Sequence, residues 1–192
     1  SLGLQDNGTR IRQGSGAALA TSAVFEDAIG GDGFGTLWHP ADAARVLASL
    51  YYANLQISAD GGATFNAATT GLTGAGDANA APTFTNSTVF RTATFGGSWS
   101  PISNAASLPL SGRVIRNVAG SALDPKSVAI VTSGGTGFAT ADGGATWTQF
   151  GTLPGNALFM SSVWFDPLNE RTLYAASVAP DPAATHLWRS LD

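Results

Sequence analysis

Short apolar segments rich in β-branched residues recur along the chain, and turns that contain proline or glycine separate them. Three segments share one layout, a strand pattern, a proline turn and a second strand pattern, at residues 37–49, 121–132 and 163–176. Short strand patterns bounded by turn residues are typical of antiparallel sheets. The hydrophobic pattern therefore predicts an all-β chain. Trp164 and Trp188 fall on strand patterns and are expected in the core.

An eight-residue motif recurs between these segments. Residues 58–65 read SADGGATF and residues 140–147 read TADGGATW. Residues 92–99 form a worn copy, TATFGGSW, with Thr94 in place of the aspartate, and residues 190–192 (SLD) read as the opening of a fourth copy. From one aspartate position to the next the spacing is 34, 48 and 50 residues. These periods match the size of one structural repeat.

Together, the layout and the motif define a four-stranded unit. Its order is strand, proline turn, strand, short link, strand, Asp-Gly-Gly turn and strand, which is the order of an antiparallel propeller blade. About four such units fill the chain. We expect a single partial β-propeller domain over residues 1–192, with blades near 1–65, 66–100, 101–148 and 149–192.

The Asp-Gly-Gly turn has a local physical explanation. A carboxylate can accept hydrogen bonds from the main chain, glycines tolerate positive φ, and the threonine and aromatic residue that follow restart a strand. We therefore interpret the motif as a hairpin staple and not as a catalytic or metal site. The structural positions are Ser58, Asp60, Gly62, Thr64 and Phe65 in the first copy and Thr140, Asp142, Gly144, Thr146 and Trp147 in the third.

These residues resemble the Asp-box repeat, also called the bacterial neuraminidase repeat, which occurs in sialidases, xyloglucan-cleaving glycoside hydrolases, sortilin-type receptors and photosystem assembly factors. The order of Gly3–Thr9, Gly30–Phe34 and Leu50–Leu55 before the first copy is similar to large secreted bacterial proteins of the sialidase-like or glycosyl-hydrolase-like kind. The resemblance implies a propeller of roughly six to eight blades and an extracellular or cell-surface location. We accordingly expect a fragment of a larger propeller, whose remaining blades come from the same or another chain.

Composition narrows the choice of partners. Charged residues make up 11% of the chain, and the formal net charge is −4, with no basic patch. Binding to phosphate backbones requires clustered cations, so nucleic acid is not an expected partner. The apolar runs fall short of the roughly 20 residues that a membrane span needs. Cysteine is absent, which excludes disulfides and thiolate zinc sites.

Two carboxylates outside the repeated motif, Asp6 and Asp32, each lie in a glycine-rich stretch. Loops at one face of a propeller commonly form its binding site, and a pair of carboxylates there could act as general acid and base in glycoside cleavage. The alternative is that both belong to ordinary turns, with carboxylates that bind main-chain amides. Further candidate binding residues are Asn7, His39, Tyr51 and Tyr52.

No metal site or cofactor is expected, because His39 and His186 are the only histidines and lie far apart in sequence. Sialidase activity is not expected either, since the resemblance would require an Arg-Ile-Pro element and residues 10–12 (RIR) lack the proline. The leading hypothesis is an extracellular, non-catalytic scaffold that binds a glycan or protein, or that assembles into a larger structure. The alternative is a fragment of a secreted glycoside hydrolase that uses Asp6 and Asp32 as paired carboxylates.

Overall fold

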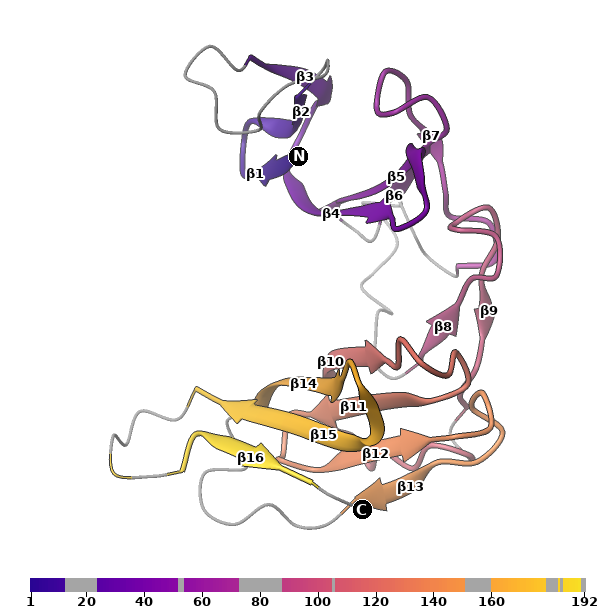
Figure 1. The fold of residues 1–192 in the computed structure, drawn as a ribbon, viewed down its shortest axis with the longest axis vertical. Helices are drawn as coiled ribbons and strands as arrows, with labels where there is room; N and C mark the ends of the chain where they lie inside the picture. The colour runs from indigo at the N-terminus through magenta and orange to yellow at the C-terminus, as the bar shows by residue number, and fades with distance from the viewer. Residues whose placement is uncertain are drawn as a thin grey trace. The chain divides into compact units, whose positions relative to one another are not determined.

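The computed structural model describes residues 1–12, 24–51, 54–72, 88–104, 106–150, 160–178, 183 and 185–190. These residues form sixteen β-strands in five antiparallel sheets, which confirms the predicted all-β class (Figure 1). The strands are β1 Leu2–Leu4, β2 Gly8–Arg12, β3 Phe25–Ile29, β4 Gly33–His39, β5 Asp42–Leu50, β6 Leu55–Ser58, β7 Asn66–Ala67, β8 Phe90–Arg91, β9 Ser100–Pro101, β10 Ile115–Gly120, β11 Val128–Thr132, β12 Gly137–Thr140, β13 Thr148–Phe150, β14 Met160–Asp166, β15 Asn169–Ser177 and β16 Leu187–Arg189.

Two of the sheets have the predicted four-stranded order. Strands β4-β5-β6-β7 and β10-β11-β12-β13 follow one another across their sheets in chain order. In three sheets a proline turn joins the first strand to the second. Pro40 lies between β4 and β5, Pro125 between β10 and β11, and Pro167 between β14 and β15 of the three-stranded sheet β14-β15-β16. Residues 1–65, expected as one blade, carry two sheets, because β1-β2-β3 pair separately from β4–β7. The short pair β8-β9 lies between the two four-stranded sheets in sequence.

The chain folds as two compact units. Unit 1 comprises Ser1–Thr83 with Arg91–Ser100, and unit 2 comprises Phe84–Phe90 with Pro101–Asp192. The hairpin β8-β9 is shared between them, since each of its strands contains one residue of each unit.

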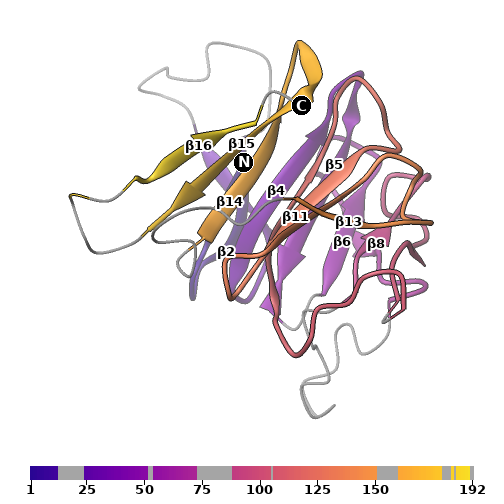
Figure 2. The same ribbon diagram turned by 90° about the horizontal axis from the view of Figure 1, so that it is seen from below.

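In unit 2, strand β11 is buried on both faces, and this follows from the alternation of side chains along a strand. Val128 and Ile130 belong to one apolar cluster, and Ala129 and Val131 belong to the other. The first cluster contains Val89, Leu108, Leu110, Ile115, Val128, Ile130, Phe138 and Trp147. The second contains Ala129, Val131, Val163 and Ala175, and it joins the sheet β10–β13 to the sheet β14–β16. Figure 2 shows β14, β15 and β16 as neighbouring strands in the perpendicular view.

The two four-stranded sheets differ in the size of the side chains in one row. Leu37, Leu47 and Ile57 face one another across β4, β5 and β6. The corresponding row across β10, β11 and β12 consists of three alanines, Ala119, Ala129 and Ala139. The alanine row packs in the second apolar cluster of unit 2, where the neighbouring sheet contributes larger side chains.

In unit 1, main-chain atoms of neighbouring sheets come into direct contact. The N–H of Gly8 donates to the carbonyl of Gly31 at 2.6 Å, and a side chain at Gly3 would collide with the main chain of Phe34. Ile11 on β2 and Val46 on β5 are fully buried. The glycine-rich N-terminal third is therefore explained by close approach of the backbones of β1–β3 and β4.

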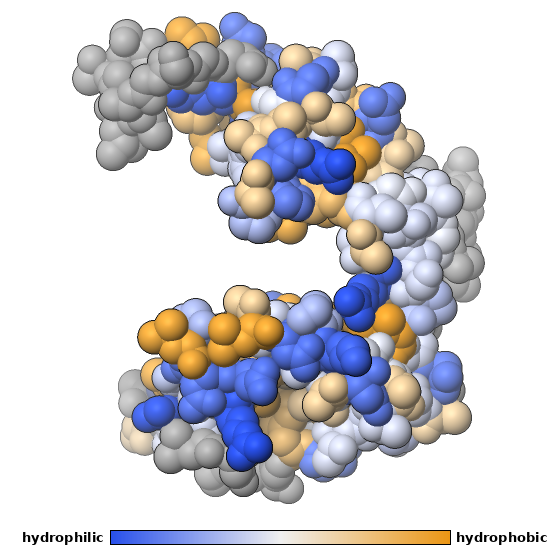
Figure 3. Space-filling model, turned by 45° about the vertical axis from the view of Figure 1, so that its right-hand side comes forward, coloured by the Kyte–Doolittle hydropathy of each residue, from blue (hydrophilic) through white to orange (hydrophobic). Residues whose placement is uncertain are grey.

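Several large apolar side chains are exposed, and Figure 3 shows hydrophobic areas among hydrophilic ones on the surface. They include Val24, Phe34, Leu37, Leu168 and Leu187. In the part of the chain that the structure describes, no helix has the length and apolar character of a membrane-spanning segment.

We expect Ile130→Ala to lower the free energy of unfolding of unit 2 by about 2–5 kcal/mol, because the substitution leaves a cavity in a tightly packed core. Ile130 is fully buried, whereas Val118 on β10 is 48% exposed. The matched control Val118→Ala should change the same free energy by less than about 0.5 kcal/mol. Urea unfolding followed by tryptophan fluorescence measures both, and equal effects would contradict the assigned core.

Candidate functional site

The three copies of the repeated motif form the same hydrogen-bonded hairpin, and we call residues 58–65, 92–99 and 140–147 box 1, box 2 and box 3. In box 1, the Ser58 hydroxyl donates to Asp60 Oδ1 at 2.7 Å and accepts from the N–H of Gly62 at 2.8 Å. The main-chain N–H of Thr64 donates to Asp60 Oδ1 at 2.9 Å, and its hydroxyl donates to Oδ2 at 2.6 Å. The carboxylate thus closes the turn from both sides.

Box 3 repeats this geometry. The Thr140 hydroxyl donates to Asp142 Oδ1 at 2.7 Å and accepts from the N–H of Gly144 at 2.9 Å. The Thr146 hydroxyl donates to Asp142 Oδ2 at 2.6 Å, and the Thr146 N–H donates to the same carboxylate at 3.0 Å.

Box 2 keeps the turn with a hydroxyl in place of the carboxylate. Thr94 Oγ1 accepts from the N–H of Ser98 at 2.9 Å, and Thr92 Oγ1 accepts from the N–H of Gly96 at 2.8 Å. The hydroxyls of Thr94 and Ser98 lie 3.4 Å apart, so this contact is weaker than its counterparts in the other boxes. Phe95 stands at the first glycine position with φ +52°, a left-handed conformation that side chains rarely adopt.

Each complete box is also bound to its own sheet. The N–H of Gly61 donates to the carbonyl of Ala44 at 2.8 Å, and the N–H of Gly143 donates to the carbonyl of Lys126 at 3.0 Å. Ala44 is the third residue of β5, and Lys126 lies between Pro125 and the start of β11. The box therefore joins the two turns at one end of its sheet.

The box carboxylates are strong acids for a physical reason. Hydrogen bonds from the hydroxyl and N–H of Thr64 and from the hydroxyl of Ser58 lower the pKa of Asp60 from 3.8 to about 2. The equivalent bonds, first from the hydroxyl and then from the N–H of Thr146, hold the pKa of Asp142 well below its ordinary value. A general acid at neutral pH needs a raised pKa, so these two carboxylates are suited to a structural role.

The opposite end of the sheets in unit 1 carries the catalytic candidates. Because loops of an antiparallel sheet alternate between its two ends, the β1–β2 turn, residues 30–32 and the β5–β6 link share the end away from box 1. The main-chain N–H of Asp6 donates to Asp32 Oδ1 at 2.7 Å, and Asp6 has φ +59°. We call this end, formed by Gln5–Asn7, Gly30–Asp32 and Tyr51, the loop face.

Tyr51 and Asn7 belong to the loop face. Tyr51 is 43% exposed, and a Cβ placed on Gly31 would lie 3.1 Å from a carbon of its ring. The side-chain amide of Asn7 donates to the carbonyl of Gln5 at 3.1 Å. The structure therefore brings together Asp6, Asn7, Asp32 and Tyr51, which are 45 residues apart at their extremes.

His39 lies apart from this group. It is at the other end of β4, about 20 Å from Asp32 at the rise of an extended strand. His39 Nδ1 accepts from the N–H of Ala41 at 3.2 Å, and its ring meets Phe95 edge-on with centroids 5.0 Å apart. These contacts are those of a turn residue. Tyr52, the remaining candidate, is outside the described residues.

The two tryptophans expected in the core have different positions. Trp188 packs against the second apolar cluster of unit 2, as predicted. The prediction for Trp164 is wrong, since Trp164 is 39% exposed and stacks on Tyr174 with centroids 5.7 Å apart. The guanidinium group of Arg189 lies over the Tyr174 ring, with its central carbon 5.9 Å from the ring centroid. Strand register aligns these three side chains, and the sequence pattern alone could not choose which face is buried.

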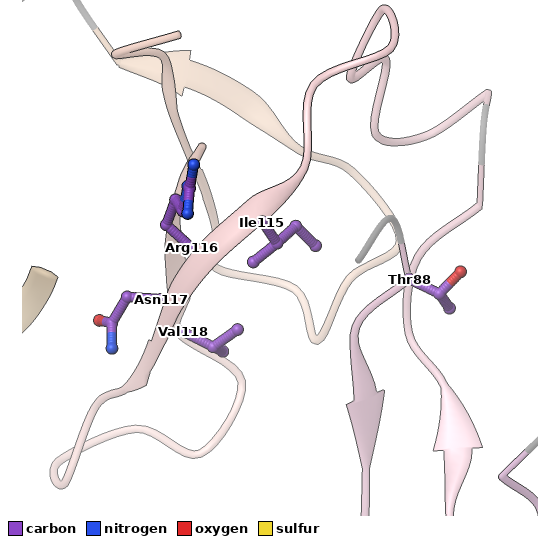
Figure 4. A pocket seen from close by; sticks show the side chains of 5 residues that line it. All are labelled: Thr88, Ile115, Arg116, Asn117 and Val118. Carbon is purple, nitrogen blue, oxygen red and sulfur yellow. The ribbon is translucent and has the colours of Figure 1, made fainter. Parts of the chain in front are cut away.

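A hollow of about 340 Å³ lies beside β10 in unit 2, and Figure 4 shows its lining residues. Ile115 and Val118 extend toward the side on which Thr88 lies, and Arg116 and Asn117 extend away from it. Asn117 Oδ1 accepts from the N–H of Val163 at 3.0 Å, which ties β10 to β14. The hollow has no convergent acidic or nucleophilic side chains, and in the described ranges no cluster of His, Cys, Asp and Glu could hold a metal ion.

Comparison with known proteins identifies the architecture. No family model matches the chain, and no curated protein matches it. Among solved structures, an ancestral GH74 enzyme matches with TM-score 0.52 and 18% identity over 82% of this chain and 25% of the enzyme. The GH74 enzyme of Niastella koreensis matches with TM-score 0.54 and 18% identity over 90% of this chain and 33% of that one. YCF48 from Cyanidioschyzon merolae matches with TM-score 0.50 and 16% identity over 83% of this chain and 56% of that one.

The chain has the fold of part of a β-propeller. It spans a quarter to about half of the length of these larger propeller chains. At such low identities the likeness concerns the fold and not the activity.

We expect Asp60→Asn to lower the melting temperature of unit 1 by a few degrees at pH 7, since an amide cannot accept both hydrogen bonds of Thr64. The folded-state pKa of Asp60 lies below its ordinary value, so its stabilisation is present above about pH 4 and is lost as the pH falls through about 2. The difference between wild type and variant should shrink over that range in thermal melts. The control Asn66→Ala, at an uncharged and exposed position of β7, should show no such convergence.

We expect Thr94→Asp to stabilise unit 1 by about 1 kcal/mol at pH 7, because a carboxylate in box 2 can accept from both the N–H and the hydroxyl of Ser98. Thr70→Asp, at an exposed position of the same unit, is the control. Urea unfolding compares the two variants. No gain over the control would show that the box carboxylate contributes nothing to stability.

Proposed function

We propose that this chain is part of an extracellular, non-catalytic propeller that binds a glycan at the loop face. The observation that carries the proposal is the hydrogen bond from the Asp6 main-chain N–H to Asp32 Oδ1 at 2.7 Å. This bond gives Asp32 the role of a turn staple, like Asp60 in box 1. It supports a rigid loop face and not a free acid–base pair.

The surroundings of the two carboxylates favour the same interpretation. Asp6 is exposed and Asp32 is half-buried, whereas a general acid in glycoside cleavage commonly depends on an apolar pocket that favours its protonated form. The carboxylate of Asp32 is also committed to the main chain of its would-be partner.

A glycan suits the chemistry of the loop face better than a charged ligand does. Tyr51 offers a partly exposed ring beside a residue that has no side chain, Gly31. A ring with a polar tip can stack on a sugar and hydrogen-bond to it. Asn7 and Asp6 are exposed polar neighbours. The low content of charged residues, 11%, supports a neutral ligand and an extracellular setting.

We expect Tyr51→Ala to weaken glycan binding about tenfold, because it removes the stacking surface. Titration calorimetry against a panel of neutral and sialylated oligosaccharides would measure the affinity. Leu168→Ala is the matched control, since Leu168 is 89% exposed and lies in unit 2. If the chain bound a protein and none of the glycans, the proposal of a glycan ligand would be wrong.

The alternative, a fragment of a secreted glycoside hydrolase, is tested with Asp6→Asn and Asp32→Asn. Hydrolysis of any panel member by the wild-type chain, lost in both variants, would overturn the non-catalytic proposal.

Antibody labelling of intact host cells and of the culture medium tests the extracellular location, and signal only after lysis would contradict it.

A further inference from the structure

Asn7 and Gly8 form the one Asn-Gly pair in the sequence. Such a pair can react within the chain. The main-chain nitrogen of the glycine attacks the side-chain amide carbon of the asparagine, a new C–N bond forms, and ammonia leaves. Water then opens the cyclic imide at either of its carbonyls, which leaves aspartate or isoaspartate at the asparagine position. Glycine favours the attack because it has no Cβ beside its nitrogen.

The side chain of Asn7 is accessible for this reaction. Asn7 is exposed in the turn between β1 and β2, so water can reach an imide formed there. A single hydrogen bond within the same exposed turn, from the side-chain amide to the carbonyl of Gln5 at 3.1 Å, holds it. The side chain therefore needs little rearrangement before it can turn toward the main chain.

The nitrogen of Gly8 is held away from the reaction. Gly8 is buried, and its N–H donates to the carbonyl of Gly31 at 2.6 Å. A second bond joins the same two loops, since the N–H of Asp6 donates to Asp32 Oδ1 at 2.7 Å. A nitrogen that is buried and hydrogen-bonded cannot attack the amide carbon of Asn7. The reaction therefore waits for a local opening that separates the two loops.

The fold requires the glycine of this reactive pair. Gly8 has φ +69°, which side chains other than hydrogen rarely tolerate. A Cβ at this position would also collide with the carbonyl oxygen of Ile29 on β3. Replacement of Gly8 would therefore disturb the pairing of β2 with β3, and the reactivity of the pair is a consequence of how these strands pack.

The Asp-Gly pairs of the boxes are better protected from the same ring closure. The carboxylate of Asp60 is ionised, and it accepts from the hydroxyl of Thr64 at 2.6 Å. An ionised carboxylate is a poor target for a nucleophile. The N–H of Gly61, the nitrogen that would attack, donates to the carbonyl of Ala44 at 2.8 Å. Box 3 repeats both features, so the chemistry points to Asn7.

We infer that Asn7 is a site of spontaneous deamidation, unreactive while the two loops of the loop face are joined and reactive when they separate. The two hydrogen bonds between the loops set its rate. The only other reactant is water, and the products are ammonia and a chain with aspartate or isoaspartate at position 7.

The modification changes the loop face. A carboxylate at position 7 cannot donate to the carbonyl of Gln5, and it adds a negative charge beside Asp6 and Asp32. Isoaspartate also adds a carbon atom to the main chain within the turn from Leu4 to Gly8, which face each other across β1 and β2. The turn then loses its register.

The test follows Asn7 in the full chain, which is incubated in a mildly alkaline buffer, digested with trypsin and analysed by mass spectrometry of the peptide Ser1–Arg10. The free peptide of the same sequence gives the rate without the fold. We expect the folded chain to react more slowly than the free peptide by at least about tenfold, because opening precedes the reaction. We expect Asp32→Ala to raise the rate in the folded chain by about tenfold, the factor for loss of one hydrogen bond to a charged acceptor.

Asp60→Asn is the matched control. It alters a turn carboxylate at the opposite end of the same unit and leaves both bonds between the loops in place, so the rate at Asn7 should not change. Equal acceleration by the two variants would show that unfolding of the whole unit sets the rate, and this result would overturn the inference. An unchanged rate in Asp32→Ala, or equal rates for the folded chain and the free peptide, would overturn it as well.

A second measurement needs no substitution. In the wild-type chain, urea concentrations below the unfolding transition should raise the deamidation rate at Asn7 in parallel with hydrogen exchange of the Gly8 amide, because both depend on the same opening. Deamidation that does not follow the exchange of this amide would refute the role of the Gly8 hydrogen bond. Neither measurement involves a glycan, so the outcome is independent of the function proposed for the loop face.

Discussion

The carboxylate of Asp142 accepts hydrogen bonds from the hydroxyl of Thr140 and from the hydroxyl and N–H of Thr146. These bonds fix a tight turn in which Gly143 and Gly144 both take positive φ. Without the turn, β12 and β13 would not meet in register, and Trp147 would not reach the preceding repeat. In box 3 a carboxylate at the surface thus fixes the turn that precedes Trp147, a buried core residue.

Contacts between repeats then follow from the turn. The second glycine of each box allows close approach to the preceding part of the chain, and in boxes 2 and 3 an indole hydrogen bond fixes the distance. Box 2 shows that the contact between repeats persists when the turn has no carboxylate. It has a hydroxyl at the aspartate position and a strained Phe95, and its Trp99 still bonds to Ala68 at 2.8 Å. The contact between repeats therefore tolerates loss of the carboxylate.

The boxes could be predicted from the sequence because their interactions are local, within five residues of Asp60 or Asp142. The pairing of Asp6 with Asp32 could not, since it joins residues 26 apart and depends on how β1–β3 approach β4. Likewise, the glycine-rich stretch around Asp32 suggested a turn, and nothing in it indicated that the seven residues of β4 would separate His39 from the loop face. For Trp164, alternation along the strand gave the correct period and left the choice of buried face to the neighbouring sheet.

The alanine row Ala119, Ala129 and Ala139 stands where the first four-stranded sheet has Leu37, Leu47 and Ile57. The two sheets share one topology, yet each accepts a neighbour of different bulk. Large side chains at the three alanine positions would clash with Phe165, Leu173 and Trp188, which pack against this row. Side-chain volume in a single row therefore encodes the order of the repeats, and the protein is a sequence of non-interchangeable parts despite its repeated backbone.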